Sequence, residues 1–82
     1  MPVENYGELT IRMSLENYEA IKGRCAGIIR DNGFRIQETR YRVDRVNNEV
    51  QMDFVLTYSK GKDREGMLMD LSGLEGVREV SG

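Results

Sequence analysis

The sequence predicts an α+β fold, a ferredoxin-like βαββαβ sandwich in which two helices cover one face of a four-stranded antiparallel sheet. Strict alternation of apolar and polar residues over 49–59 and 7–14 predicts two strands, each with one buried and one wet face. Apolar residues at three- and four-residue steps over 15–31 and 64–74 predict two helices. Right-handed crossovers would then place both helices on one side of the sheet, with the first and third strands central.

Length and composition indicate one small domain. The 82 residues leave room for a thin core only. We expect residues 1–6, which hold the only proline, to be a lead or linker, and residues 7–82 to form the domain. A net charge of −2 and a pI near 5.1 disfavour nucleic acid as a partner. One cysteine and no histidine exclude an internal disulfide and the usual zinc sites, which favours a reducing compartment.

The first strand is followed by a helix with a predicted start and stop. Ser14 stands where a helix cap is expected, since its side chain oxygen can accept from backbone N–H groups of the first turn. Asn32 and Gly33 should end the helix, because glycine adopts the left-handed conformation without a steric penalty. The apolar stripe of this helix consists of Tyr18, Ile21, Cys25, Ile28 and Ile29.

The second strand, expected over 34–46, changes parity between Ile36 and Tyr41. A bulge near 37–39 would account for the change, and bulges are commonest at sheet edges. Its dense charge is also typical of an edge strand. Asn47 and Asn48 tolerate positive φ and predict a hairpin into the third strand.

The remaining elements are shorter. Residues 60–63 read as a turn, and 64–71 as a weakly capped helix in which Gly66 costs about 1 kcal/mol relative to alanine. Residues 77–81 predict a last strand with Val80 pointing inward.

No residue pattern predicts catalysis, a metal site or a cofactor, so we do not expect an enzyme. Cys25 lies on the apolar helical stripe with no histidine to activate it. The carboxylates of Asp53, Asp63, Glu65 and Asp70 match no calcium loop. The expected open sheet face carries no aromatic side chain on which RNA bases could stack.

Two segments are candidate ligand sites. The first is the loop after the first strand, with Ser14, Glu16 and Asn17. The second is the turn with Lys60, Lys62 and Arg64, where the start of the following helix could receive an anion.

The tail, MLMDLSGLEGVREVSG, resembles the closing helix and strand of ACT-type regulatory domains. The positions that carry the resemblance are Leu68, Leu71, Leu74, Gly76, Val77 and Val80. The chain is also similar to the ACT-like soluble domain at the carboxyl end of MgtC/SapB-type membrane proteins, which are associated with magnesium homeostasis. It departs from amino-acid-binding ACT domains in lacking a glycine in the loop after the first strand.

The resemblance implies a non-catalytic regulatory or interaction domain, the cytoplasmic part of a larger, transport-associated membrane protein. It would be attached to the inner membrane through an upstream segment. The expected partners are further copies of the chain, as a homo-oligomer, or the parent transmembrane region, with contact through the helices or the polar sheet face. The alternative is a small-ligand sensor domain for an amino acid, a nucleotide or an anion.

Overall fold

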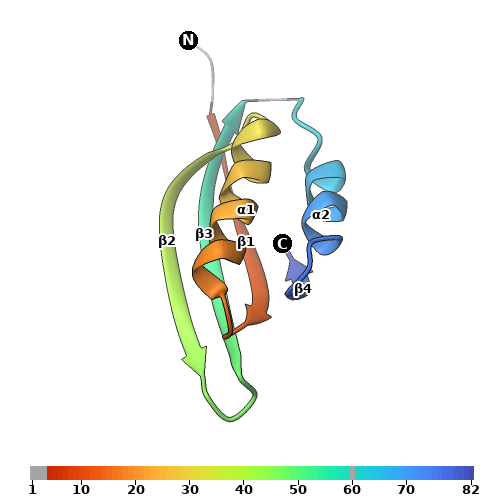
Figure 1. The fold of residues 1–82 in the computed structure, drawn as a ribbon. Coiled ribbons are helices and arrows are strands. Elements are labelled where there is room, and N and C mark those ends of the chain that lie inside the picture. Colours follow the sequence, from red (N-terminus) through yellow and green to blue (C-terminus); the bar gives the residue numbers. More distant parts are fainter. Residues whose placement is uncertain (1–3, 60) are drawn as a thin grey trace.

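The computed structural model describes residues 4–59 and 61–82 and confirms the predicted fold (Figure 1). All neighbouring strands run antiparallel in the order β2-β3-β1-β4, so the first and third strands are central. Among the described residues, no helix combines the length and the apolarity needed to cross a bilayer. The elements are β1 Glu4–Ser14, α1 Tyr18–Asp31, β2 Arg35–Asp44, β3 Glu49–Ser59, α2 Arg64–Ser72 and β4 Val77–Ser81.

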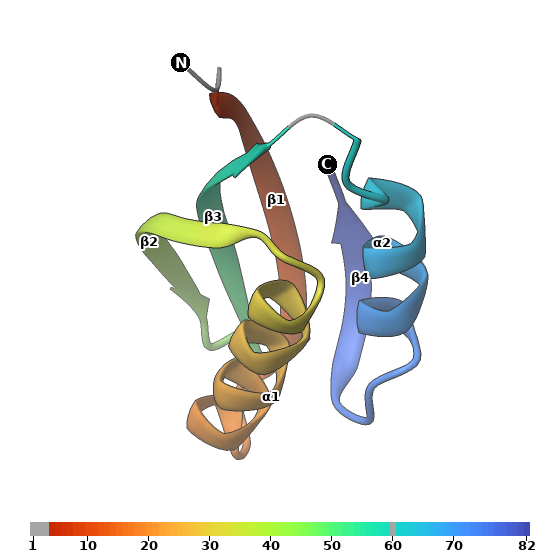
Figure 2. The ribbon, with the colours of Figure 1, turned by 90° about the horizontal axis from the view of Figure 1, so that it is seen from above.

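The core lies between the two helices and one face of the sheet (Figure 2). The alternation of β1 and β3 accounts for it, because Leu9 pairs with Phe54 and Ile11 with Met52, and these four side chains are at most 1% exposed. The helices cover this face with residues at helical spacing. Their buried members are Ile21, Cys25 and Ile29 of α1 and Met67 and Leu71 of α2.

The first strand starts earlier than expected. Glu4 pairs with Ser59 and Tyr6 with Thr57, so residues 4–6 belong to β1 and the strand start predicted at residue 7 is wrong. Residues 1–3 of the expected lead lie outside the described residues. The polar composition of the segment concealed a strand, because main-chain pairing with β3 needs no apolar side chain at its end.

The predicted cap of α1 is wrong. The helix begins at Tyr18 after Asn17, which has φ 60° and makes no side chain hydrogen bond to the first turn. Ser14 is the last residue of β1, and its backbone N–H donates to the carbonyl of Gly76 at 2.9 Å. The predicted end is confirmed: Gly33 has φ 85°, and its N–H donates to the carbonyl of Arg30 at 2.9 Å.

The start of α2, predicted to be weakly capped, carries a side chain cap. Oδ1 of Asp63 accepts from the backbone N–H of Gly66 at 2.9 Å. A Cβ on Gly66 would collide with the Asp63 carboxylate, so glycine leaves room for the cap. The stabilisation by this cap offsets the low helix propensity of Gly66.

The predicted bulge and hairpin are both confirmed, although β2 is shorter than the expected 34–46. Ile36 pairs with Leu56 and Glu38 with Val55, which leaves Gln37 as the extra residue. At the other end of β2, Asn48 has φ 52°, and Asp44 accepts from the backbone and side chain of Asn47. These contacts fix the loop that returns the chain to β3.

Candidate ligand and interaction sites

The loop after β1 borders a hollow of about 360 Å³. All three predicted residues of this loop line it, together with residues that the sequence analysis did not select. The bond from Ser14 to Gly76 holds the α2–β4 connection against the loop. The lining residues are Ser14, Glu16, Asn17, Ala20, Ile21, Arg24, Glu75 and Gly76.

The hollow carries charge of both signs. Within the described residues, Glu16, Glu75 and Arg24 form no ion pair with one another or with other side chains. Ile21 supplies an apolar floor, since its side chain is 5% exposed. The arrangement suits a small polar ligand that carries charged groups and an apolar part.

The second predicted site lies at the other end of β1 and is already engaged in contacts within the chain. Nη2 of Arg64 donates to the carbonyl of Glu8 at 2.6 Å, and the Lys62 side chain lies against Gly33. The carboxylate of Asp63 occupies the start of α2, where an anion was expected to bind. Lys60 lies outside the described residues. The structure therefore brings Ser14, Glu16 and Asn17 together but keeps Lys62 and Arg64 apart from them.

Two further chemical candidates, Cys25 and Asp53, are accounted for by the fold. Burial raises the pKa of the Cys25 thiol to about 11, so the nucleophilic thiolate is scarce at neutral pH. Asp53 accepts a hydrogen bond from the Thr10 hydroxyl at 2.8 Å. In the described part of the chain, no group of three or more His, Cys, Asp or Glu residues is arranged to hold a metal ion.

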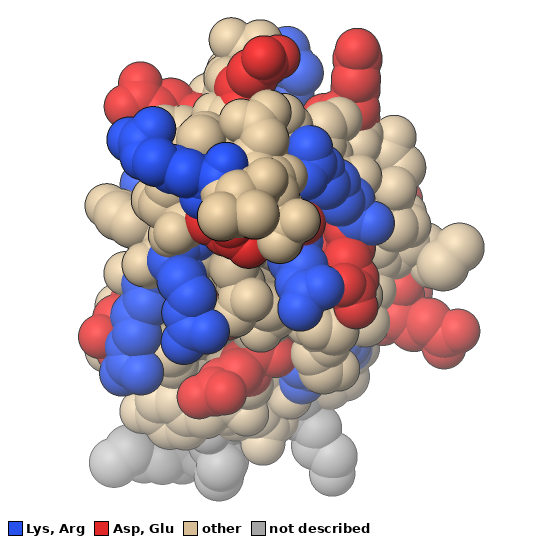
Figure 3. Space-filling model, turned by 90° about the horizontal axis from the view of Figure 1, so that it is seen from below, with Lys and Arg blue, Asp and Glu red and all other residues tan. Residues whose placement is uncertain are grey.

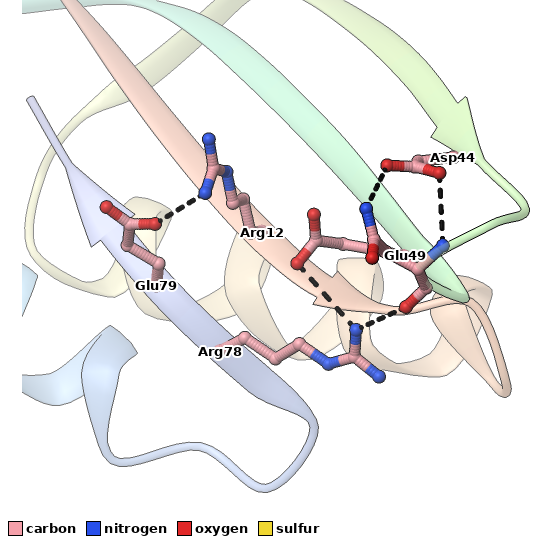
Figure 4. Close-up of polar contacts among 6 residues, drawn as sticks. Arg12, Asp44, Glu49, Arg78 and Glu79 are labelled. Atoms are coloured by element: carbon pink, nitrogen blue, oxygen red, sulfur yellow. Dashed lines mark hydrogen bonds and ion pairs between the residues drawn. The ribbon is translucent and has the colours of Figure 1, made fainter.

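The sheet face away from the helices is open and polar. Its side chains form cross-strand contacts at the end near the β2–β3 loop (Figure 4). Nη1 of Arg12 lies 2.9 Å from Oε2 of Glu79, and Nη1 of Arg78 lies 3.7 Å from Oε1 of Glu49. Arg78 also donates to the carbonyl of Asn47 at 2.8 Å, which ties β4 to the hairpin. Thr57 is only 2% exposed between its register partners Tyr6 and Arg35. The expectation that this face carries no aromatic side chain is wrong, because Tyr6 belongs to β1 with the parity of Glu8 and is 70% exposed.

An apolar rim, which we define as Tyr41, Val43 and Val46, holds three of the large apolar side chains that are exposed in the described part of the chain. These side chains are 60%, 50% and 95% exposed. Tyr41 pairs with Met52 and Val43 with Val50, so both have the parity of the core side of the sheet, beyond the cover of α1. Lys22 of α1 lies 5.5 Å from the centre of the Tyr41 ring. Figure 3, viewed from the hairpin end, shows Lys and Arg side chains on several sides of an uncharged centre, with Asp and Glu side chains between them.

Comparison with known proteins gives a fold likeness. No family model matches the chain, and no curated protein matches it. A solved structure of the C-terminal domain of the MgtC protein from Mycobacterium tuberculosis is similar with a TM-score of 0.73. The two sequences are 14% identical, and the match covers 98% of this chain and 85% of that one. The predicted similarity to the C-terminal soluble domain of MgtC-type proteins is thus confirmed for the fold: the chain has the fold of the MgtC C-terminal domain.

Proposed function

We propose that the chain is a non-catalytic regulatory or interaction domain of a larger, transport-associated membrane protein, on its cytoplasmic side. The fold shared with a C-terminal domain of MgtC supports the place of the chain within a larger protein. The observation that carries the interaction role is the apolar rim, because exposed apolar patches on small domains mark contacts with other proteins.

The rim extends the core surface of the sheet sideways. The positions of Tyr41 and Val43 continue the buried row of Met52 and Val50 on the neighbouring strand, so a partner placed there would complete the cover of the sheet. Val46 adds an apolar side chain at the hairpin. The occupant that we propose for the rim is the remainder of the parent protein, which stays in permanent proximity through the chain itself.

The membrane part of the proposal is tested by the reading frame upstream of Met1. We expect apolar stretches of about 20 residues there, long enough to span a bilayer. A frame that begins at Met1 would contradict an amino-terminal membrane attachment.

The rim is tested by substitution in the parent protein. Val43→Ser with Val46→Ser should increase protease cleavage around the domain and alter the transport-associated activity, while the amount of protein in the membrane stays constant. Met69→Ser is the matched control, because Met69 is an apolar residue on α2 whose 68% exposure lies between those of Val43 and Val46. Equal effects of the control and the rim variant would refute a specific contact.

A small-ligand sensor is the second candidate, favoured by the hollow that gathers Ser14, Glu16 and Asn17. Thermal unfolding with amino acids, nucleotides and simple anions at millimolar concentration should reveal a ligand as a raised Tm, since binding to the folded state alone stabilises it. Arg24→Gln should abolish that rise, and Lys62→Gln, at the other end of β1, should preserve it. Unchanged Tm values throughout would remove this candidate.

A further inference from the structure

Across β1, β3 and β2, the open sheet face carries a charge pattern that is complementary to itself, and on β4 Glu79 pairs with Arg12. Residues paired across β1, β3 and β2 form straight rows whose side chains point away from the helices. We name three of them the acidic row, the middle row and the basic row. The acidic row is Glu8, Val55 and Glu38, the middle row is Thr10, Asp53 and Arg40, and the basic row is Arg12, Gln51 and Arg42.

The rows are evenly spaced. The acidic row and the basic row each lie two register positions from the middle row, on opposite sides of it, which is about 7 Å along the strands. A rotation of 180° about the middle row therefore exchanges the acidic row with the basic row. On β1 it exchanges Glu8 with Arg12, and on β2 it exchanges Glu38 with Arg42.

We propose that two copies of this chain pack their open sheet faces against each other, with the two-fold axis along the middle row. This inference rests on the proposed role as an interaction domain. Glu8 then lies opposite Arg12 of the second copy, and Glu38 lies opposite Arg42 of the second copy. The symmetry makes each of these pairs twice, as an isologous interface requires.

The next rows out continue the complementarity on β2. Arg35 and Asp44 are the outermost members of β2 on this face, at matching distances from the middle row. The same rotation places Arg35 of one copy opposite Asp44 of the other. Hydrogen bonds from the side chain and backbone of Asn47 lower the pKa of Asp44.

The middle row meets its own copy at the axis, where like charges oppose each other. Asp53 accepts from Thr10 at 2.8 Å, and Arg40 donates to Glu38 at 3.2 Å, so each charge has a partner within its own chain. Neighbouring strands are about 4.8 Å apart, so the long Arg40 side chain can also reach Asp53 of the second copy.

The charges at this interface are partly solvent-exposed in the single chain, with side chain exposures of 48% for Arg12 and 51% for Glu38. Exposed ion pairs are individually weak and are screened by salt. The dimer should therefore form at high protein concentration and low ionic strength. It should dissociate in 1 M salt, where the Debye length is about 3 Å.

Sedimentation velocity at several protein concentrations, in low salt and in 1 M salt, tests the dimer. Arg12→Glu and Glu8→Arg should each raise the dissociation constant at least about tenfold, because each variant places like charges opposite one another. An equal mixture of the two variants should form a mixed dimer. The Arg12→Glu variant carries carboxylates at positions 8 and 12, and the Glu8→Arg variant carries guanidinium groups at both positions, so opposite charges face each other again. Circular dichroism and Tm verify that both variants fold.

Matched controls are Arg30→Glu on α1 and Asp70→Arg on α2, which reverse exposed charges away from the sheet face and should leave dissociation unchanged. A wild-type chain that stays monomeric in low salt overturns the inference, and so does a mixture that fails to reassemble. A dimer that ignores these reversals but is lost with Val43→Asp also overturns it, and assigns the contact to the apolar rim. The outcome of the rim experiment in the parent protein does not depend on whether this dimer forms.

Discussion

Asn17, like Asn48, is a residue other than glycine with a positive φ. It has φ 60° and ψ 24° at the start of α1, and its side chain donates or accepts no capping bond there. Asparagine tolerates this left-handed region better than most residues, but glycine adopts it without steric cost. The strain lies in the loop that borders the hollow, beside Glu16.

Replacing Asn17 with glycine should therefore raise the free energy of unfolding, by up to about 1 kcal/mol, and Asn17→Val should lower it by about 1–2 kcal/mol. Urea unfolding measures both. Asn32→Gly is the control, because Asn32 has φ −86° and its side chain donates to the carbonyl of Ile28 at 2.8 Å. We expect this control to destabilise the chain. Similar losses at both positions would contradict strain at Asn17.

Asp44 should make stability depend on pH. Hydrogen bonds from the Asn47 side chain and backbone lower its pKa from the ordinary value of 3.8, so the folded state binds its proton less readily than the unfolded chain does. The stabilisation is thus present above pH 3.8 and is lost as the pH falls through the lower folded pKa. The stability difference between wild type and Asp44→Ala should shrink over that acid range. A difference that is constant from pH 7 to pH 2 would refute this.

Among the elements, α2 is a short helix with a side chain cap at its start. It spans nine residues and holds only Met67 and Leu71 in the core. A helix this short is marginal without tertiary packing and capping. The bond from Gly66 to Asp63 satisfies one of the N–H groups that have no partner within the helix.

Asp63→Ala should lower the free energy of unfolding by about 1 kcal/mol, the usual effect of losing an N-cap. Hydrogen exchange should show the loss of protection first at the backbone amides of α2. Asp70→Ala, an exposed position of the same helix, should change stability by less than about 0.5 kcal/mol. If the two substitutions have equal effects, the Asp63 bond is not a significant cap.

The alternating strands and the start of α2 at Arg64 were predictable from sequence, and the start of α1 was not. The alternation of Leu9 to Met13 and of Val50 to Leu56 reflects burial on one sheet face, which is a property of each strand alone. The cap of α1 depends instead on how many loop residues separate Ser14 from Tyr18. Asn17 is the residue before the helix because of the path of the loop, and the preference of side chains for cap positions does not reveal that path.

At the scale of the whole molecule, stability rests on one small core. Phe54 is 1% exposed and lies on the central strand β3, opposite Leu9. Phe54→Ala should lower the free energy of unfolding by about 3–5 kcal/mol, a large share of the roughly 5–15 kcal/mol that is typical of small domains. Val55→Ala, one residue along and on the open face, should cost much less. Guanidinium unfolding compares the two, and equal costs would mean that the open face is not solvent-exposed in solution.

The candidate sites were predictable only in part. Ser14, Glu16 and Asn17 adjoin in sequence, but Arg24 and Glu75 join them through the packing of α1 and the α2–β4 connection. The exposure of Tyr41 and Val43 depends on how far α1 extends over β2, and the sequence of β2 carries no signal of that. The rows of the open face required the register, which the extra residue Gln37 shifts.

Because of the extra residue Gln37, β2 should not tolerate insertions or deletions within the strand. If Gln37 were deleted, one part of the strand would have to turn over relative to β3, and a one-residue slip inverts every side chain it affects. Inverting 38–44 would turn Arg40 and Arg42 toward the core side of the sheet and Thr39, Tyr41 and Val43 toward the open face. Related chains should therefore vary in the identity of their β2 residues. They should accept insertions and deletions only in the loop at 45–48, where a change in length does not move side chains from one face of the sheet to the other.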